Sequence, residues 1–527
     1  MNLLRKIFST KNLHLMAMLL VILQSVIDMD YLFYDFLDQF GLPRFSTIVR
    51  FIIIPGLILW SFVQREKNKK RTFVFGSIYG IALLVFFLLH NSQSQSLLSV
   101  LNLTDNFYYS SFQELTYVLT LVLPYGLMYV FYHEHFTDLD MKKMTVWTSA
   151  LIGVPIFIGD LFVFGKSTYY GYTVANFFSW FTDIYSSYHP RTLASKFFFN
   201  EGNTIGILML MVLPLMYYYF SKAKSRKEKV GLGVLIAIQS LSMQILSTRV
   251  ATYGAVLIPA VFIVLYLFDH FLHSGTKILK SLIIYCICTA SVFGLMLNFT
   301  PAVQNQKVDA KNDVALLTNG MAEEGMEMLG NAEDLVPGTP EYINFYVYMF
   351  EVYGIKARYI QSVPSMYYTD YYSYQKDPKF WVDVTFMPVY DRVSGRQIET
   401  IFFNYKYQNL TPAQKVLGMG YSTFMNGSIV LEQDFKQQVY TLGYAGVMLC
   451  CVPWLLVALF GLYQLLRRFK QMIDLKTMCL CVSFCAAIGS AWLSGHTLDQ
   501  FVTSVFMALV VSLLLNHIHD VKEELKK

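Results

Sequence analysis

The chain has 527 residues, of which 55% are apolar and 15% are charged, and it carries a formal net charge of +5. Soluble domains contain about 25% charged residues, so a soluble protein could not bury this much apolar surface. The weak positive charge gives no indication of nucleic-acid binding. The composition therefore predicts an integral membrane protein.

Apolar stretches long enough to cross a bilayer as helices recur along the whole chain. A spanning helix needs about 20 predominantly apolar residues, and stretches such as 72–89 and 250–268 contain no charged residue. The predicted spans lie near 13–30, 46–63, 72–90, 113–132, 144–164, 203–220, 230–247, 250–268, 279–299, 440–465, 476–493 and 498–516. We expect an all-α polytopic membrane protein with about 12 transmembrane helices, and a large, partly helical extracytoplasmic loop between spans 9 and 10.

Basic residues predict the orientation of these spans, because short cytoplasmic loops are enriched in lysine and arginine. The basic clusters all fall on one side of the predicted spans: Arg5, Lys6 and Lys11; Arg65, Lys67, Lys69, Lys70 and Arg71; Lys142 and Lys143; Lys222, Lys224, Arg226, Lys227 and Lys229; Lys277 and Lys280; Arg467, Arg468 and Lys470; Lys522, Lys526 and Lys527. Both termini are therefore predicted in the cytoplasm. The first span lacks a small-residue cleavage site, so we expect an uncleaved signal anchor.

This topology divides the chain into three regions. Residues 1–299 form a membrane bundle of spans 1–9 with a shorter outer loop at 165–202, residues 300–438 form the large extracytoplasmic loop, and residues 439–527 hold spans 10–12 and a cytoplasmic tail. The large loop is polar up to Pro340 and then rich in tyrosine. Its aromatic side chains suit sugar rings, but they also suit the bilayer interface or ordinary packing.

Two other features argue against particular classes of site. All seven cysteines lie within apolar stretches, so neither a disulfide framework nor a zinc site is predicted. The sequence Asp138-Leu139-Asp140 has the spacing of the metal motif of nucleotide-sugar glycosyltransferases, but the predicted topology places it in a short cytoplasmic loop. We interpret it as a solvated loop.

Single ionisable residues at the outer ends of spans are the first candidates for function, because such residues are costly there unless they are paired or functional. Arg249 stands in a very short turn between two spans, where it could meet a lipid headgroup or simply extend to the membrane surface. Arg50, at the outer start of the second span, and His496, between the last two spans, are placed in a similar way.

A second group of candidates lies at the end of the large loop. It consists, in chain order, of Ser394-Gly395-Arg396, Leu417-Gly418-Met419-Gly420, Glu432-Gln433-Asp434-Phe435 and Gly443-Tyr444-Ala445-Gly446. Earlier in the chain, Phe198-Phe199-Asn200-Glu201-Gly202-Asn203 leads into the sixth span. The order and topology of these motifs are more specific than any one of them.

Over about residues 197–510, this arrangement resembles the bacterial O-antigen ligase and repeat-unit polymerase superfamily. In the ligases the polar cluster holds a histidine, where this chain has Glu432, and Thr441 stands where those proteins often have glutamate. The resemblance therefore favours the polymerase branch found in capsule and exopolysaccharide systems. It implies a multi-pass protein of the bacterial plasma (inner) membrane.

The activity implied by the resemblance is inverting, metal-independent glycosyl transfer on the outer face, without a cofactor. The implied partners are a polyprenyl-diphosphate-linked glycan donor and acceptor in the lipid bilayer; a flippase and a chain-length regulator of a synthesis complex are left open. Arginines bind phosphate oxygens with bidentate, permanently charged hydrogen bonds. Arg249 and Arg396 are the expected diphosphate ligands, with Arg392 as a substitute for Arg396 and Arg50 as a further candidate.

The attacking hydroxyl must lose a proton, which a carboxylate or imidazole within hydrogen-bonding reach could accept. Glu432 is the first choice for this base, followed by Asp434 and His496. Both acidic residues could instead stabilise the start of the tenth spanning helix, because carboxylates are favoured at helix N-termini.

Three other functions remain as alternatives. One is ligase-like transfer of a glycan to a different acceptor. The second is a metal-dependent glycosyltransferase that uses polyprenyl phosphate and binds its metal through Asp28-Met29-Asp30 in the first outer loop. The third is a flippase or transporter of lipid-linked glycans, which the nearly charge-free span centres and the lack of a visible internal repeat disfavour.

Overall fold

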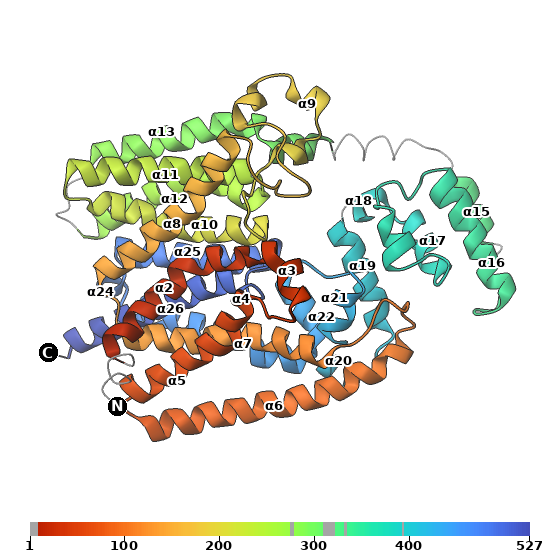
Figure 1. The fold of residues 1–527 in the computed structure, drawn as a ribbon, viewed down its shortest axis with the longest axis horizontal. Helices are drawn as coiled ribbons and strands as arrows, with labels where there is room; N and C mark the ends of the chain where they lie inside the picture. The colour runs from red at the N-terminus through yellow and green to blue at the C-terminus, as the bar shows by residue number, and fades with distance from the viewer. Residues whose placement is uncertain (1–8, 274–278, 309–321, 331–334, 393–394, 527) are drawn as a thin grey trace. The chain divides into compact units, whose positions relative to one another are not determined.

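A computed structural model describes residues 9–273, 279–308, 322–330, 335–392 and 395–526, and Figure 1 shows that these residues form helices joined by loops. No strand occurs among them, apart from an isolated bridge between Lys166 and Tyr172. The prediction of an all-α fold is confirmed. Five residues named above lie outside the described residues: Arg5, Lys6, Lys277, Ser394 and Lys527.

Twelve helical segments of the described chain are long and apolar enough to cross a membrane, which confirms the predicted number. Nine of them precede the large loop: α2 to α3 (Thr10–Gln39, continuous through η1, Asp28–Phe33), α4 to α5 (Phe45–Arg65, through η2, Val49–Ile53), α6 (Lys69–Val100), α7 (Ser111–Glu134), α8 (Asp138–Leu161), α10 (Gly202–Lys222), α11 (Arg226–Leu246), α12 (Arg249–Leu272) and α13 with its continuation (Lys280–Val308). Three follow it: α22 to α23 (Asp434–Arg467), α25 (Leu475–Leu493) and α26 (Phe501–Glu524).

Shorter helices fill the connections. They are η3 (Phe177–Phe181), α9 (Ile184–Ser187) and η4 (Pro190–Leu193) in the shorter outer loop; α15 (Ala322–Gly330), α16 (Pro340–Met349), η6 (Phe350–Lys356), η7 (Tyr367–Tyr371), α17 (Pro378–Phe386), α18 (Val389–Arg392), α19 (Gly395–Gln408), α20 (Pro412–Leu417) and α21 (Tyr421–Asn426) in the large loop; and α24 (Phe469–Met472) before α25. The described part of the large loop is thus largely helical.

Several helix starts follow directly from local sequence. The side chains of Thr137, Ser225, Thr248 and Asp474 each accept a hydrogen bond from a backbone N–H in the first turn of the helix they precede. Such N-caps satisfy donors that the helix itself leaves unpaired. Capping therefore fixes the starts of α8, α11, α12 and α25.

The chain separates into two compact units, each described here by itself. Unit 1 consists of residues 1–79, 118–305 and 452–527. Unit 2 consists of residues 80–117 and 306–451, and it contains most of the described part of the large loop.

The centre of unit 1 is α10, which packs against α8, α11, α12, α25 and α26 (Figure 1). Small polar contacts link these helices: Gln239 on α11 donates to the carbonyl of Met209 at 2.8 Å and accepts from Ser149 at 2.5 Å. Ser242 donates to the carbonyl of Gly153 at 2.7 Å. Membrane helices commonly associate through small and polar residues of this kind.

Unit 2 is organised around an aromatic core. Tyr372 and Trp381 are almost fully buried, and the Trp381 indole donates to the Tyr372 carbonyl at 2.7 Å. Further buried aromatic residues of this core are Phe107, Tyr346, Phe350, Tyr353, Tyr359, Phe380, Phe402, Phe403 and Phe424. The structure therefore uses many of the loop's aromatic rings for packing, one of the alternatives left open by the sequence.

Candidate functional site

Two of the glycine motifs meet inside unit 2. Gly418 and Gly443 both have a positive φ, of +81° and +67°, and a Cβ added to Gly418 would lie 2.4 Å from the Gly443 nitrogen. Gly443 interrupts α22, and beside this kink the Tyr440 carbonyl accepts a hydrogen bond from the Met419 N–H at 3.0 Å. Both glycines are needed because only glycine allows this backbone conformation at such close approach.

A buried histidine and glutamate support the same motif. His90 Nε2 lies 2.8 Å from Glu114 Oε1, and both side chains are fully buried. His90 Nδ1 lies 2.6 Å from the Leu417 carbonyl oxygen, so this nitrogen must carry a proton. Glu114 also accepts the backbone N–H groups of Tyr421 and Ser422, at 3.0 and 2.8 Å. The pair therefore fixes the segment that contains the first glycine motif.

The two loop arginines have different environments. Arg392 is buried, and it donates to the carbonyls of Met387 and Tyr359 at 2.9 and 2.5 Å. Burial lowers the pKa of its guanidinium to about 10. Arg396 is partly exposed, and its Nε and Nη2 contact Glu432 Oε2. Of the two, only Arg396 presents its charge at the surface of unit 2.

The acidic candidates of the polar cluster are also separated. Glu432 is about one third exposed and is engaged by Arg396. Asp434 is buried, as the first residue of α22. Its position at a helix N-terminus agrees with the helix-stabilising alternative.

One group of charged residues of unit 1 lies at the helix ends that include Arg50, Arg249 and His496, and we call this end the rim. The rim consists of residues 28–50 and 162–201, the α11–α12 turn and the turn that precedes α26. Arg50 belongs to it: its guanidinium contacts Asp28 and lies 5.1 Å from the centre of the Phe501 ring. Arg50 is thus already paired with a carboxylate.

The second acidic residue of the first outer loop is paired in the same way. Asp30 accepts from Arg44 at 2.6 Å and from the Ser46 backbone N–H at 2.7 Å. Asp28 and Asp30 are therefore each paired with an arginine at the start of the second spanning segment. Among the residues that the structure describes, no group of three or more His, Cys, Asp or Glu residues could hold a metal ion.

The shorter outer loop lies directly on the α11–α12 turn. Thr168 and Tyr169 donate their hydroxyls to the carbonyls of Leu246 and Ser247, at 2.7 and 3.0 Å. The Ser195 N–H donates to the Ile245 carbonyl at 3.0 Å. These contacts place the loop beside the N-terminus of α12.

Two lysines of this loop lie next to each other. The Lys196 N–H donates to the Lys166 carbonyl at 3.1 Å, and the Lys166 ammonium lies 4.8 Å from the centre of the Tyr31 ring. The Lys196 ammonium donates to the Asn200 carbonyl at 2.7 Å. Burial lowers the pKa of Lys196; Glu201 opposes this effect and Lys166 adds to it.

Arg249 is the first residue of α12, immediately after the capping residue Thr248. Its side chain is exposed, and within the described part of the chain it forms no hydrogen bond or ion pair. A cation at a helix N-terminus opposes the helix dipole, so this position offers no stabilisation to the folded chain. The positive charge of the Arg249 side chain adds to the partial positive charge at the N-terminus of α12. Together they favour the binding of an anion.

His496 lies in the turn before α26 with a left-handed backbone, at φ +58°. Its Nε2 is 3.5 Å from Glu201 Oε1, and its Nδ1 is 3.4 Å from Asp499 Oδ2. Glu201 also accepts a hydrogen bond from the Thr204 hydroxyl at 3.0 Å. The rim thus contains an imidazole between two carboxylates.

Arg50, Arg249 and His496, which are predicted at outer ends of spans, all lie at helix ends of the unit 1 rim. Lys166, Lys196, Glu201 and Asp499 were not predicted as site residues. Glu201 is an unusual residue for its position: it is the N-cap of α10, where Ser, Thr, Asp and Asn are preferred. Its partners could not be identified from local sequence.

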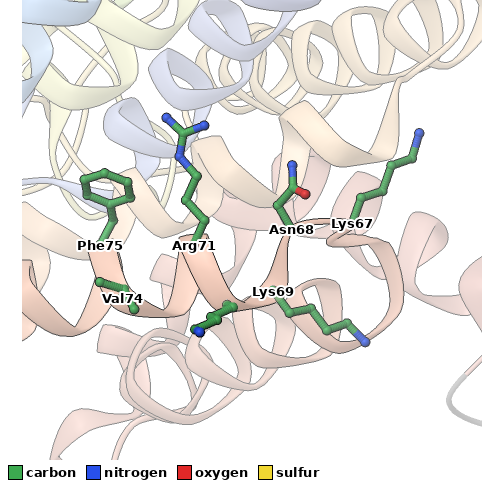
Figure 2. Close-up of a pocket in the computed structure, with 7 residues that line it drawn as sticks. Lys67, Asn68, Lys69, Arg71, Val74 and Phe75 are labelled. Carbon is green, nitrogen blue, oxygen red and sulfur yellow. The ribbon is translucent and has the colours of Figure 1, made fainter.

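A separate hollow lies at the α5–α6 connection, and Figure 2 shows the side chains around it. It is lined by Lys67, Asn68, Lys69, Lys70, Arg71, Val74 and Phe75. The Arg71 guanidinium lies 5.7 Å from the centre of the Phe75 ring. The hollow belongs to a basic connection that the predicted topology assigns to the cytoplasm, so we do not include it in the candidate site.

Comparison with known proteins identifies the family. The family described as O-antigen ligase like membrane protein matches residues 10–521, which is nearly the whole chain. No curated protein and no solved structure matches it. The family and the spanning helices together indicate a multi-pass membrane protein, and the family supports glycan transfer at a membrane. The chain therefore belongs to the O-antigen ligase-like family of membrane proteins.

Proposed function

We propose that this protein polymerises oligosaccharide repeat units carried on polyprenyl diphosphate, at the outer face of the bacterial plasma membrane. The product would be a capsule, exopolysaccharide or O-antigen chain. Family membership supports glycan transfer in general. The choice of polymerisation over ligation is supported by Glu432, which stands where the ligases carry a histidine and is engaged by Arg396.

The single observation that carries this proposal is the exposed charge of Arg249 at the N-terminus of α12. The transfer releases a lipid diphosphate, whose oxygens gain negative charge as the glycosidic bond breaks. A preorganised cation at that point lowers the barrier, and its contribution is large because it requires no rearrangement during the reaction. Arg249 is exposed, has no described partner and lies at a helix N-terminus, so its charge is available for this purpose.

The proposed reaction is an inverting displacement. A hydroxyl oxygen of the acceptor glycan attacks the anomeric carbon of the donor, and the bond between that carbon and the diphosphate oxygen breaks. The diphosphate leaves with the electron pair, and a base takes the hydroxyl proton. We propose neither a metal nor a cofactor for this step, and we regard a flippase and a chain-length regulator as candidate partners.

The test measures glycan chain length in proteoliposomes that contain the purified protein and a lipid-linked repeat unit. We expect wild type to form long chains and Arg249→Ala to lose at least about a hundredfold in rate, by analogy with the loss of one oxyanion donor. Lys280→Ala is the matched control, because Lys280 is also an exposed cation at the first residue of a helix.

Retention of long products by Arg249→Ala would remove Arg249 from the site. If wild type moved single repeat units across the bilayer without joining them, the protein would be a flippase instead. Transfer of one glycan to a different acceptor, with no chain growth, would indicate a ligase.

A further inference from the structure

At the unit 1 rim, the imidazole of His496 lies between the carboxylates of Glu201 and Asp499. We propose that Glu201 accepts the proton of the attacking sugar hydroxyl, and that His496 and Asp499 position it. This inference rests on the proposed function and adds a catalytic residue to it.

The Glu201 side chain does not cap the helix that it precedes. It occupies the N-cap of α10, yet it makes no capping hydrogen bond to the helix backbone. Its Oε2 instead accepts from the Thr204 hydroxyl, and its Oε1 faces His496 Nε2 at 3.5 Å. The carboxylate is therefore held by side chains, in a fixed direction.

Exposure decreases in order along the three residues. The side chain of Glu201 is 34% exposed, that of His496 is 17% exposed and that of Asp499 is 6% exposed. Asp499 Oδ2 lies 3.4 Å from His496 Nδ1, while its Oδ1 is buried without a hydrogen-bond partner. Only Glu201 is open enough to meet a substrate, and the other two lie behind it.

The backbone keeps the imidazole in place. Gly495 and His496 both have a positive φ, of +75° and +58°. A left-handed conformation is common for glycine and uncommon for most other residues, although histidine adopts it more often than most. The two positive φ values give the turn that carries the imidazole a defined backbone conformation.

The surrounding charge also suits this role. Lys196 lies close enough to Glu201 for the two charges to interact, and Lys166 is adjacent to Lys196. Nearby cations favour the ionised carboxylate, which is the form that accepts a proton. Exposure, contacts to Thr204 and His496, and the nearby cation Lys196 together make Glu201 the candidate base at the rim.

In the proposed step, the proton of the acceptor hydroxyl passes to a Glu201 carboxylate oxygen as the hydroxyl oxygen bonds to the anomeric carbon. The carbon–oxygen bond to the diphosphate breaks, and the lipid diphosphate carries away the electron pair. Water then removes the proton from Glu201.

The test compares initial rates of chain extension by full-length variants in the same proteoliposomes. We expect Glu201→Gln to lower kcat at least about a hundredfold, as is typical for removal of a general base, with KM for the lipid-linked donor changed less than about threefold. Added formate should restore part of the activity of Glu201→Ala. Asp183→Asn is the control, because Asp183 is an exposed carboxylate of the same outer loop.

The dependence on pH separates catalysis from a structural role. The kcat/KM of wild type should fall at acidic pH as the base is protonated, whereas Glu201→Gln should lose this decline. Full activity of Glu201→Gln, or loss of activity without rescue of Glu201→Ala by formate, would overturn the assignment while leaving the proposed function intact. An inactive wild type would overturn the proposed function itself.

Discussion

The charged groups of the two units differ in how fully the protein itself satisfies them. In unit 2, Arg392 donates to backbone carbonyls, Arg396 contacts Glu432 and His90 contacts Glu114. In the unit 1 rim, Arg249 has no described partner. Charged side chains of unit 2 are therefore used for internal contacts, whereas the charge of Arg249 in unit 1 is available for a ligand.

The cost of burial explains this difference. A buried charge without a partner is very unfavourable, so the buried groups of unit 2 must be hydrogen-bonded. Exposed residues such as Arg249 are hydrated, and the folded protein can keep them unpaired. Substitutions in unit 2 should therefore affect stability first, and substitutions in the rim should affect activity first.

The largest effect on stability is expected for Glu114→Ala. This change leaves His90 and the backbone N–H groups of Tyr421 and Ser422 buried without their acceptor. Loss of one member of a buried pair costs about 3–5 kcal/mol. We expect a clearly lower Tm of the detergent-solubilised protein and faster proteolysis of the large loop.

Asp370→Asn serves as the control for this prediction, because Asp370 is an exposed carboxylate of unit 2. A second variant, His90→Phe combined with Glu114→Ala, should lose less than the sum of the two single changes. A Tm of Glu114→Ala equal to that of wild type would contradict the structural role of the pair.

An intermediate effect that depends on pH is expected for Lys406. Burial lowers the pKa of this ammonium group to about 8, although Asp377 partly opposes the shift. The unfolded chain therefore binds more protons than the folded chain between about pH 8 and the unperturbed lysine pKa of about 10.4. Folding stability should rise with pH across this window, because the penalty for the buried charge disappears as Lys406 loses its proton.

The comparison is between wild type and Lys406→Met, whose stability is measured by thermal or chemical unfolding of the full chain. We expect wild type to gain about 2 kcal/mol relative to the variant between about pH 7.5 and 10. The Tyr372 hydroxyl accepts from Lys406 at 2.7 Å, so both forms of the amine retain a neighbour. A constant difference between the two proteins at all pH values would show that Lys406 does not titrate in this window.

The smallest effect on stability is expected for Arg396→Ala. The pair with Glu432 is about one third exposed, and exposed ion pairs contribute about 0–1 kcal/mol. Because Glu432 already compensates its charge, we also expect Arg396→Ala to slow chain extension less than Arg249→Ala does. A larger loss of transfer by Arg396→Ala, at unchanged Tm, would reverse this order and assign the main diphosphate contact to unit 2.

The sequence by itself determined the spans, the helix starts and the family. Span length, hydropathy and capping are local properties, so the segment near 203–220 was correctly predicted as the helix Gly202–Lys222. The two glycine motifs could also be recognised in the sequence. Gly418 and Gly443 have a positive φ and their backbones lie against each other, so other residue types are disfavoured there.

Only the tertiary structure decided which charged residues are paired. Arg392 and Arg396 lie four positions apart in the sequence, yet one is buried and the other reaches the surface. Glu201 and His496 come from segments far apart along the chain, and no local pattern indicates that they meet. Burial and pairing depend on packing between distant segments, and this packing selects the rim of unit 1 as the candidate site.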